Sequence, residues 1–309
     1  MTAQSHPHHI PSIPYTSPAT PLQTLDIWLP RPLTESSPTN TVWIIYVHGG
    51  AWRDPELTSS QLRPALAHLF PSPAFPPSAS IAHIAGFASL NYRLSPYDSH
   101  PTFPSDPHDE SRNVRHPVHV RDVDAAFEWL RSTYGVGPAR YEWVGIGHSC
   151  GATLLLQRLA GIGLGGVPAS AHVRPPVALV LLEGIYDLPL LLRNHSQPGV
   201  KEMYVEILEG AFGTERDVWE RASPVKGTYG RHEVRLIVLG QSEEDELVEW
   251  EQVEAMEGVL KRQGWAREGG GEGERVIVVK KIKGTHDFVW EDGAQVAMLI
   301  EEVVRQLFR

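Results

Sequence analysis

Short apolar runs alternate with segments of helical periodicity along most of this chain. The runs are rich in β-branched and aromatic residues and are bounded by glycine, proline or polar residues, which predicts buried strands. We expect strands at residues 25–29, 41–47, 81–90, 141–146, 177–182, 234–239 and 276–282. We expect helices at residues 64–70, 118–134, 152–160, 247–263 and 294–307. Apolar strands that alternate with helices predict an α/β fold, with a mostly parallel central sheet covered by helices on both faces.

The composition fits one large domain. With 309 residues, of which 41% are hydrophobic, the chain can bury a full core, and one domain with insertions fits better than two. We expect this domain to span residues 21–309. Residues 188–230 are mixed and partly helical, so we predict a small cap insertion there. Residues 1–20 are rich in proline and histidine, which predicts a flexible tail.

The charge and the single cysteine restrict the partners and the compartment. A net charge of −10 argues against nucleic acid or an anionic membrane as the main partner. No apolar run approaches the roughly 20 residues that a bilayer span needs, and residues 1–18 lack the basic start and apolar stretch of a secretory signal. Cys150 is the only cysteine, which excludes an internal disulfide and suits a reducing compartment. We therefore expect a cytoplasmic protein.

The most informative motif is Gly-His-Ser-Cys-Gly at residues 147–151. It lies between the predicted strand at 141–146 and the predicted helix at 152–160. Ser149 would then sit on a sharp strand-to-helix turn with a glycine two residues away on either side. Glycines are needed there because a side chain would collide with the neighbouring strand or helix. The motif predicts a nucleophile elbow, with Ser149 as the nucleophile.

A serine nucleophile needs a base within hydrogen-bond reach, and that base is held by an acid. In α/β-hydrolases both partners follow the nucleophile in the chain, the acid first and then the base, each after a late strand. His286 comes directly after the predicted strand at 276–282 and is our candidate base. With 15 histidines in the chain, the position of His286 in this order is what distinguishes it.

The acid is expected after the strand at 234–239, where several carboxylates compete at residues 243–246. We prefer Asp245, because Asp-x-x-Val at the opening of a helix is where this acid usually lies. Glu243 is the alternative. The run of glutamates that continues to residue 257 is most simply a solvated helix face.

An oxyanion hole is predicted from the sequence His-Gly-Gly-Ala-Trp at residues 48–52, which follows the strand at 41–47. Glycines after this strand would expose the backbone N–H groups of Gly49 and Gly50. Together with the N–H of Cys150, these donors can point at the negative charge that develops in acyl transfer.

Other reactive residue types are better explained by structural roles. The Cys150 thiol lies one position past the apex of the elbow, so we expect a small packed side chain rather than a nucleophile. The histidines and aspartates of the polar loops fit no regular metal-ligand spacing, and we expect neither a metal nor a cofactor. Those residues are His6, His8, His9, Asp98, His100, Asp106, His108 and Asp109.

These motifs resemble those of the α/β-hydrolases of the hormone-sensitive-lipase-like group, and within it the kynurenine formamidases (arylformamidases), particularly those of fungi. The resemblance extends over roughly residues 25–308. It is carried by His48-Gly49-Gly50-Ala51-Trp52, Gly147-His148-Ser149-Cys150-Gly151, Asp245-Glu246-Leu247 and His286-Asp287-Phe288. Ala51 departs from the pattern, because many relatives carry an aromatic residue there.

The resemblance implies hydrolysis of N-formyl-L-kynurenine to L-kynurenine and formate, in tryptophan degradation toward NAD. Ser149 would attack the formyl carbon, His286 would transfer the proton to the aryl amine, and Asp245 would hold His286. A formyl group needs almost no acyl pocket, so selectivity would come from the aromatic amine. Trp52 could form an apolar wall there, and a tryptophan packed in the core is the alternative.

Two other functions fit the same residues. A general carboxylesterase on small acyl esters would share the triad and differ in its pocket. A non-enzymatic, ligand-binding member of the fold is disfavoured, because such proteins usually lack one of the three triad residues. The expected partner is a small-molecule substrate, and the oligomeric state is left open, with a homodimer as one option.

Overall fold

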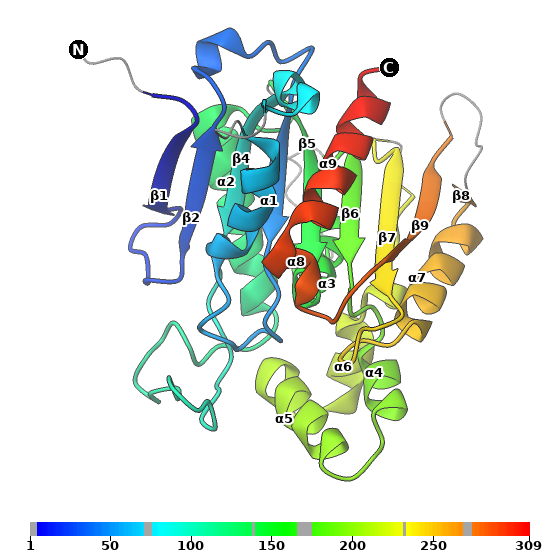
Figure 1. Cartoon of the computed structure of the whole chain (residues 1–309). Coiled ribbons are helices and arrows are strands. Elements are labelled where there is room, and N and C mark those ends of the chain that lie inside the picture. Colours follow the sequence, from blue (N-terminus) through cyan, green and yellow to red (C-terminus); the bar gives the residue numbers. More distant parts are fainter. Residues whose placement is uncertain (1–4, 71–75, 138–139, 166–174, 231–232, 268–273) are drawn as a thin grey trace.

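The computed structural model describes residues 5–70, 76–137, 140–165, 175–230, 233–267 and 274–309. Within them one sheet has the strand order β1-β2-β4-β3-β5-β6-β7-β9-β8 (Figure 1). β1 and β2 are joined to the sheet by antiparallel pairing, and the pairs from β4 through β8 are parallel. The strands are β1 His8–Pro14, β2 Thr24–Leu29, β3 Val42–Val47, β4 Ile84–Leu90, β5 Glu142–His148, β6 Ala178–Leu182, β7 Leu236–Ser242, β8 Ala266–Arg267 and β9 Val276–Ile282.

Helices cover both faces of the sheet, as the alternating pattern predicts (Figure 1). α1, α8 and α9 pack on one face, and α2, α3 and α7 pack on the other. The α-helices are α1 Arg63–Leu69, α2 Val118–Tyr134, α3 Cys150–Ala160, α4 Leu188–Asn194, α5 Val200–Phe212, α6 Arg216–Ala222, α7 Glu251–Arg262, α8 Phe288–Asp292 and α9 Ala294–Leu307. Short 3-10 helices are η1 Leu33–Glu35, η2 Ser59–Leu62, η3 Ala79–His83 and η4 Pro224–Lys226.

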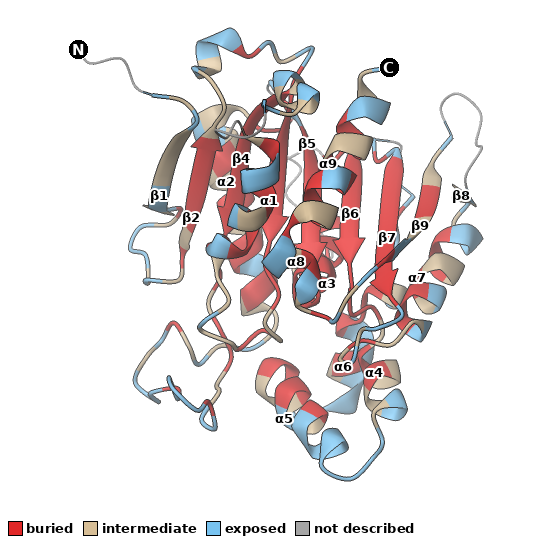
Figure 2. Cartoon of the chain, in the orientation of Figure 1, coloured by how far each residue is buried: buried red, intermediate tan, exposed pale blue. Residues whose placement is uncertain are grey.

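One hydrophobic core lies on each face of the sheet, and the central strands are buried throughout (Figure 2). Along β3, Trp43, Ile45 and Val47 contribute to one core, whereas Val42, Ile44 and Tyr46 contribute to the other. This alternation follows from the period of two in a strand, and burial on both faces explains why the run is apolar at every position. The predicted fold class is therefore confirmed, and all seven predicted strands and five predicted helices are present.

The predicted flexible tail is wrong for residues 8–14, which form β1. This strand pairs antiparallel with β2. The His9 ring stacks on Trp28 at 4.5 Å, and its Nε2 lies 3.0 Å from Asp26 Oδ2. The prolines conceal the strand in the sequence, because they interrupt the alternation of polar and apolar residues that predicts strands.

The region 188–230, predicted as a cap insertion, contains α4, α5, α6 and η4. These helices lie beyond the carboxyl ends of the parallel strands (Figure 1). Their solvent-facing residues are exposed, whereas buried residues such as Tyr204, Leu208 and Trp219 pack into the core. Within the described residues, none of the helices has the length and apolar character that crossing a membrane requires.

Candidate active site

Ser149 occupies the turn between β5 and α3, with φ 52° and ψ −125°. The two flanking glycines have no room for a side chain. A Cβ on Gly147 would lie 2.6 Å from the Ala152 nitrogen, and one on Gly151 would lie 2.1 Å from the Val47 oxygen. The Ser149 N–H donates to the Leu182 carbonyl at 2.8 Å, which ties the turn to the end of β6. The left-handed φ of a serine is a strained conformation that the surrounding packing maintains.

His286 follows β9 and faces Asp245, which follows β7. His286 Nδ1 lies 3.0 Å from both Asp245 carboxylate oxygens, and both side chains are buried. The backbone N–H groups of Leu247 and Val248 each donate to Asp245 Oδ1 at 2.9 Å, and Gln241 Nε2 donates to Oδ2 at 2.8 Å. An ionised carboxylate can only accept hydrogen bonds, so Nδ1 of His286 must carry the hydrogen of this contact. In the neutral imidazole, Nε2 is then left as the acceptor.

The alternative acid, Glu243, lies elsewhere. Its side chain is exposed and forms an ion pair with Lys281 on the surface. The structure therefore brings Asp245, and not Glu243, against His286.

Ser149 and His286 line one pocket of about 190 Å³ at the carboxyl edge of the sheet. Most of its other walls are apolar, and α5 supplies one of them. The apolar lining residues are Gly50, Ala51, Leu57, Ile185, Leu191, Met203, Ile207, Leu247 and Val248. The other polar or charged lining residues are Arg53, Asp54, Tyr97, Tyr204 and Asp287.

The turn after β3 differs from the prediction at Gly49. The Gly49 N–H donates to the buried Gln61 Oε1 at 3.1 Å, so it is already satisfied and is not an oxyanion donor. Gly50 and Ala51 reach the pocket, with φ values of 103° and 48°. Cys150 begins α3, and N–H groups in the first turn of a helix have no acceptor within it. The N–H groups of Gly50 and Cys150 thus remain the candidate donors.

The prediction that Trp52 forms a pocket wall is wrong, and its alternative, a tryptophan packed in the core, is what the structure shows. The Trp52 side chain is fully buried and packs edge-on against Phe212, with the ring centroids 5.0 Å apart, and neither residue is among those that line the pocket. The Trp52 N–H donates to the sulfur of Cys150 at 3.3 Å. Burial raises the pKa of the Cys150 thiol to about 11, so this thiol is a packed, protonated group, as expected.

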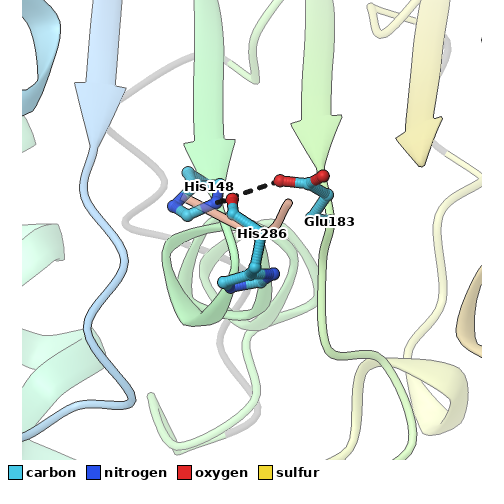
Figure 3. A group of neighbouring side chains, drawn as sticks. All are labelled: His148, Glu183 and His286. Atoms are coloured by element: carbon cyan, nitrogen blue, oxygen red, sulfur yellow. Dashed lines mark hydrogen bonds and ion pairs between the residues drawn. The ribbon is translucent and has the colours of Figure 1, made fainter. Parts of the chain in front are cut away.

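His148 contacts the backbone carbonyl of His286, and Glu183 lies against His148 (Figure 3). His148 Nε2 lies 3.0 Å from the His286 carbonyl oxygen and 3.3 Å from Glu183 Oε2. Burial lowers the pKa of His148 well below 6.5 and raises that of Glu183 to about 10, with help from Asp245 and other nearby carboxylates. Both groups are therefore neutral near pH 7, and His148 donates its Nε2–H to the carbonyl.

Among the residues that the structure describes, two groups of side chains bring possible metal-ligand atoms within 4.8 Å of one another. They are His148, Glu183 and His286, and Asp54, Glu56 and His100. In the first group the Nε2 of His148 is used as a hydrogen-bond donor to the His286 carbonyl. In the second, His100 Nδ1 accepts two backbone N–H groups, so its Nε2 carries a hydrogen toward the carboxylates. The hydrogens on these nitrogens suit hydrogen-bonded networks rather than metal coordination.

Sequence reasoning did not find Arg53, Tyr97 or the pocket residues of α5. The helical periodicity of α5 could have predicted an apolar face through Tyr204, Ile207 and Leu208, but not that part of it would meet the pocket. Arg53 directly follows the predicted oxyanion motif, and that proximity was the available signal.

The sequence of this chain is similar to those of fungal kynurenine formamidases. A kynurenine formamidase-like hydrolase of Fusarium equiseti is 34% identical over 313 residues, covering 98% of this chain and 97% of that protein. A kynurenine formamidase of Aspergillus versicolor is 36% identical over 229 residues, covering 68% of this chain and 72% of the relative. One from Meyerozyma guilliermondii is 35% identical over 223 residues, covering 70% of each. No family model matches the chain.

Solved structures share the fold. An inhibited form of esterase B of Lactobacillus rhamnosis superposes with a TM-score of 0.65 at 15% identity, covering 97% of this chain and 88% of that structure. A carbohydrate esterase from gut microbiota gives a TM-score of 0.60 at 16% identity and covers 96% of both chains. At such identities the likeness establishes the α/β-hydrolase fold, whereas function must be argued from the site.

Proposed function

Because this chain belongs to the kynurenine formamidase family of fungi, we propose that it hydrolyses N-formyl-L-kynurenine to L-kynurenine and formate. In this proposal Ser149, Asp245 and His286 form the catalytic triad. The observation that carries it is the pair of 3.0 Å contacts between His286 Nδ1 and Asp245, with His286 and the elbow serine on the same pocket.

Each step of the reaction has a group to perform it. Ser149 Oγ attacks the formyl carbon while His286 Nε2 takes its proton, and Asp245 stabilises the imidazolium. The N–H groups of Gly50 and Cys150 stabilise the tetrahedral oxyanion. The C–N bond then breaks as His286 returns the proton to the aryl amine nitrogen. A water molecule, activated in the same way, attacks the formyl ester and releases formate and free Ser149.

The proposed substrate makes unequal demands on the pocket. The acyl side needs space only for a hydrogen atom, so binding energy must come from the aromatic amine. The apolar side chains of Met203 and Ile207 on α5, together with Leu247 and Val248, offer surface for an aromatic ring. We propose that the helices of region 188–230 act as a cap that closes over this part of the substrate.

A series of acyl groups on one arylamine tests the substrate. The kcat/KM should fall by at least about tenfold from formyl to acetyl, and again from acetyl to butyryl, because each added carbon must fit a site built for hydrogen. The kcat/KM for N-formyl-L-kynurenine should also exceed that for simple aryl acetates. Equal or better turnover of butyrate esters would instead identify a general carboxylesterase.

The triad is tested by a matched pair of variants. Asp245→Asn should lower kcat on the order of 10⁴-fold, because it removes the acid that orients His286 and stabilises its charge. Glu243→Gln changes a neighbouring carboxylate that is exposed and paired with Lys281, and should have less than a threefold effect, since exposed charges are screened. A larger loss for Glu243→Gln would move the acid to that position.

A further inference from the structure

Arg53 is a buried cation on the wall of the candidate active site. It lies four residues before Leu57 and three after Gly50, and all three residues line the pocket. Only 6% of the Arg53 side chain is exposed. A guanidinium in such surroundings needs partners of opposite charge, because it cannot lose its proton.

The contacts of Arg53 hold its guanidinium at the rim between the β3 turn and α5. Its Nη1 donates to Glu206 Oε1 at 2.9 Å, and its central carbon lies 3.8 Å from the ring centroid of Tyr97. Ser99 Oγ also donates to Glu206 Oε1, at 3.0 Å. Glu206 itself is half exposed and lies outside the pocket lining. Water therefore screens the ion pair on one side, while the other side of Arg53 faces the pocket.

The charges on the pocket wall match an amino acid. Of the lining residues that the structure describes, Arg53 is the one with a permanent positive charge, and Asp54 and Asp287 contribute carboxylates. Kynurenine carries an α-carboxylate and an α-ammonium group on the side chain of its aromatic ring. Guanidinium groups bind carboxylates through paired, charge-assisted hydrogen bonds and tolerate stacking on an aromatic ring at the same time.

We propose that Arg53 binds the α-carboxylate of the substrate and thereby selects amino-acid formamides, an assignment that rests on the proposed function. The Arg53 N–H donates to the Gly50 carbonyl at 2.9 Å, so one short turn holds both the carboxylate anchor and an oxyanion donor. Fixing the far end of the substrate at Arg53 places the formamide against Ser149. That arrangement converts binding energy into orientation of the scissile bond.

Two substrates that differ only in the carboxylate test this role. They are N-formyl-L-kynurenine and its decarboxylated amine analogue, which keeps the ring, the ketone and the formamide. Arg53→Met should lower kcat/KM for the carboxylate substrate on the order of 30-fold, mainly through KM, and for the analogue less than threefold. Arg53→Lys keeps the charge but loses the forked geometry, so its loss should be intermediate and again confined to the carboxylate substrate.

Two controls separate recognition from structure. Glu206→Gln breaks the ion pair between Arg53 and α5 but keeps Arg53. It should change kcat/KM by the same factor for both substrates. Arg235→Gln removes a half-exposed arginine that pairs with Glu142, away from the pocket, and should change neither rate. Thermal unfolding of each variant confirms that it is folded.

The outcomes are distinct. Equal losses for both substrates in Arg53→Met and Arg53→Lys would overturn the assignment and make Arg53 a structural link to α5, while the proposed function stands. Wild-type protein that hydrolyses neither formamide would overturn the proposed function, and the assignment with it.

Discussion

Two turns build the candidate site, and they use glycine in different ways. In the turn after β5, Gly147 and Gly151 are required by space, because a Cβ on either would lie within 2.6 Å of backbone atoms. In the turn after β3, Ala51 and Trp52 are not glycines, yet they adopt φ values of 48° and 60°. The first turn requires glycine at two positions because neighbouring backbone leaves no room for a side chain, whereas in the second turn two residues with side chains adopt the left-handed conformation.

The two turns also differ in where their side chains point. Ser149 lies at the apex of the strand-to-helix turn, between two glycines that the pentapeptide supplies, and it lines the pocket. After β3, the adjacent residues Trp52 and Arg53 point to different places, one into the core against Phe212 and the other to the pocket wall. The role of Ser149 can be predicted from its motif. The directions of the Trp52 and Arg53 side chains depend on packing against distant segments, so their roles cannot be predicted from the local sequence.

The largest expected effect is at the apex of the first turn. Ser149→Ala should reduce turnover on the order of 10⁵-fold, because triad members act as a unit and the loss of the nucleophile leaves little for the others to do. Circular dichroism and thermal unfolding should show an intact fold. Retention of more than a tenth of the wild-type rate would contradict the elbow assignment.

The second effect separates the glycines of the two turns. Gly151→Ala places a Cβ 2.1 Å from the Val47 oxygen and should destabilise the protein by more than about 3 kcal/mol or prevent folding. Gly50→Ala meets only side-chain atoms, at 3.2 Å and beyond, although its φ of 103° adds strain, so its cost should be about 1–3 kcal/mol. Urea unfolding measures both. A larger cost at Gly50 would reverse the comparison.

Trp52→Phe tests whether the turn after β3 uses this residue for packing. Its indole Nε1 has no hydrogen-bond partner among the described residues, so the change removes buried apolar surface and no hydrogen bond. We expect a loss of about 1–3 kcal/mol in the free energy of unfolding, with KM for N-formyl-L-kynurenine unchanged within twofold. A KM that rises without a loss of stability would return Trp52 to the pocket.

A third turn, after β6, extends the comparison, because Glu183 is another non-glycine residue in the left-handed region, with φ 50°. Its pKa of about 10 in the folded protein exceeds the ordinary 4.5, so the folded state binds the proton more tightly. The contribution of Glu183 to the free energy of unfolding is therefore fully present below pH 4.5, and it is lost as the pH rises toward 10.

Glu183→Gln removes this titration and keeps an oxygen for His148. The variant should therefore gain stability relative to wild type as the pH rises, by several kcal/mol at pH 8 and by much less at pH 5. Urea unfolding at the two pH values checks the sign. A difference that does not change with pH would mean that Glu183 is ionised in the folded protein.

Much of the fold followed from the sequence because the parallel strands are buried on both faces. Such strands appear as apolar runs, and six of the parallel strands were recognised, together with β2, which pairs antiparallel with its neighbours. The elements that were missed are short or contain proline: β1, the two-residue β8, and α8, which spans only Phe288–Asp292. Their stability comes from pairing with neighbours, which no local pattern records.

The site was predictable to the extent that chain order reflects topology. Ser149, Asp245 and His286 each follow a parallel strand, and the carboxyl ends of such strands meet at one edge of the sheet. Gly49 was wrongly predicted as an oxyanion donor and Arg53 was missed, because their contacts are with residues distant in the chain. The partner of the Gly49 N–H is Gln61, and that of Arg53 is Glu206, 153 residues away, so neither contact is visible in the local sequence.

The strand β1 has a consequence for the edge of the sheet. It forms the outer edge beside β2, it carries Pro11 and Pro14, and its register shifts between Ile10 and Ile13. Prolines and irregularities of this kind keep an edge from recruiting a strand of another molecule. A chain shortened to begin after residue 20 would instead expose the regular hydrogen-bonding edge of Thr24–Leu29. We therefore expect β1 to keep this edge of the sheet from pairing with a strand of another molecule.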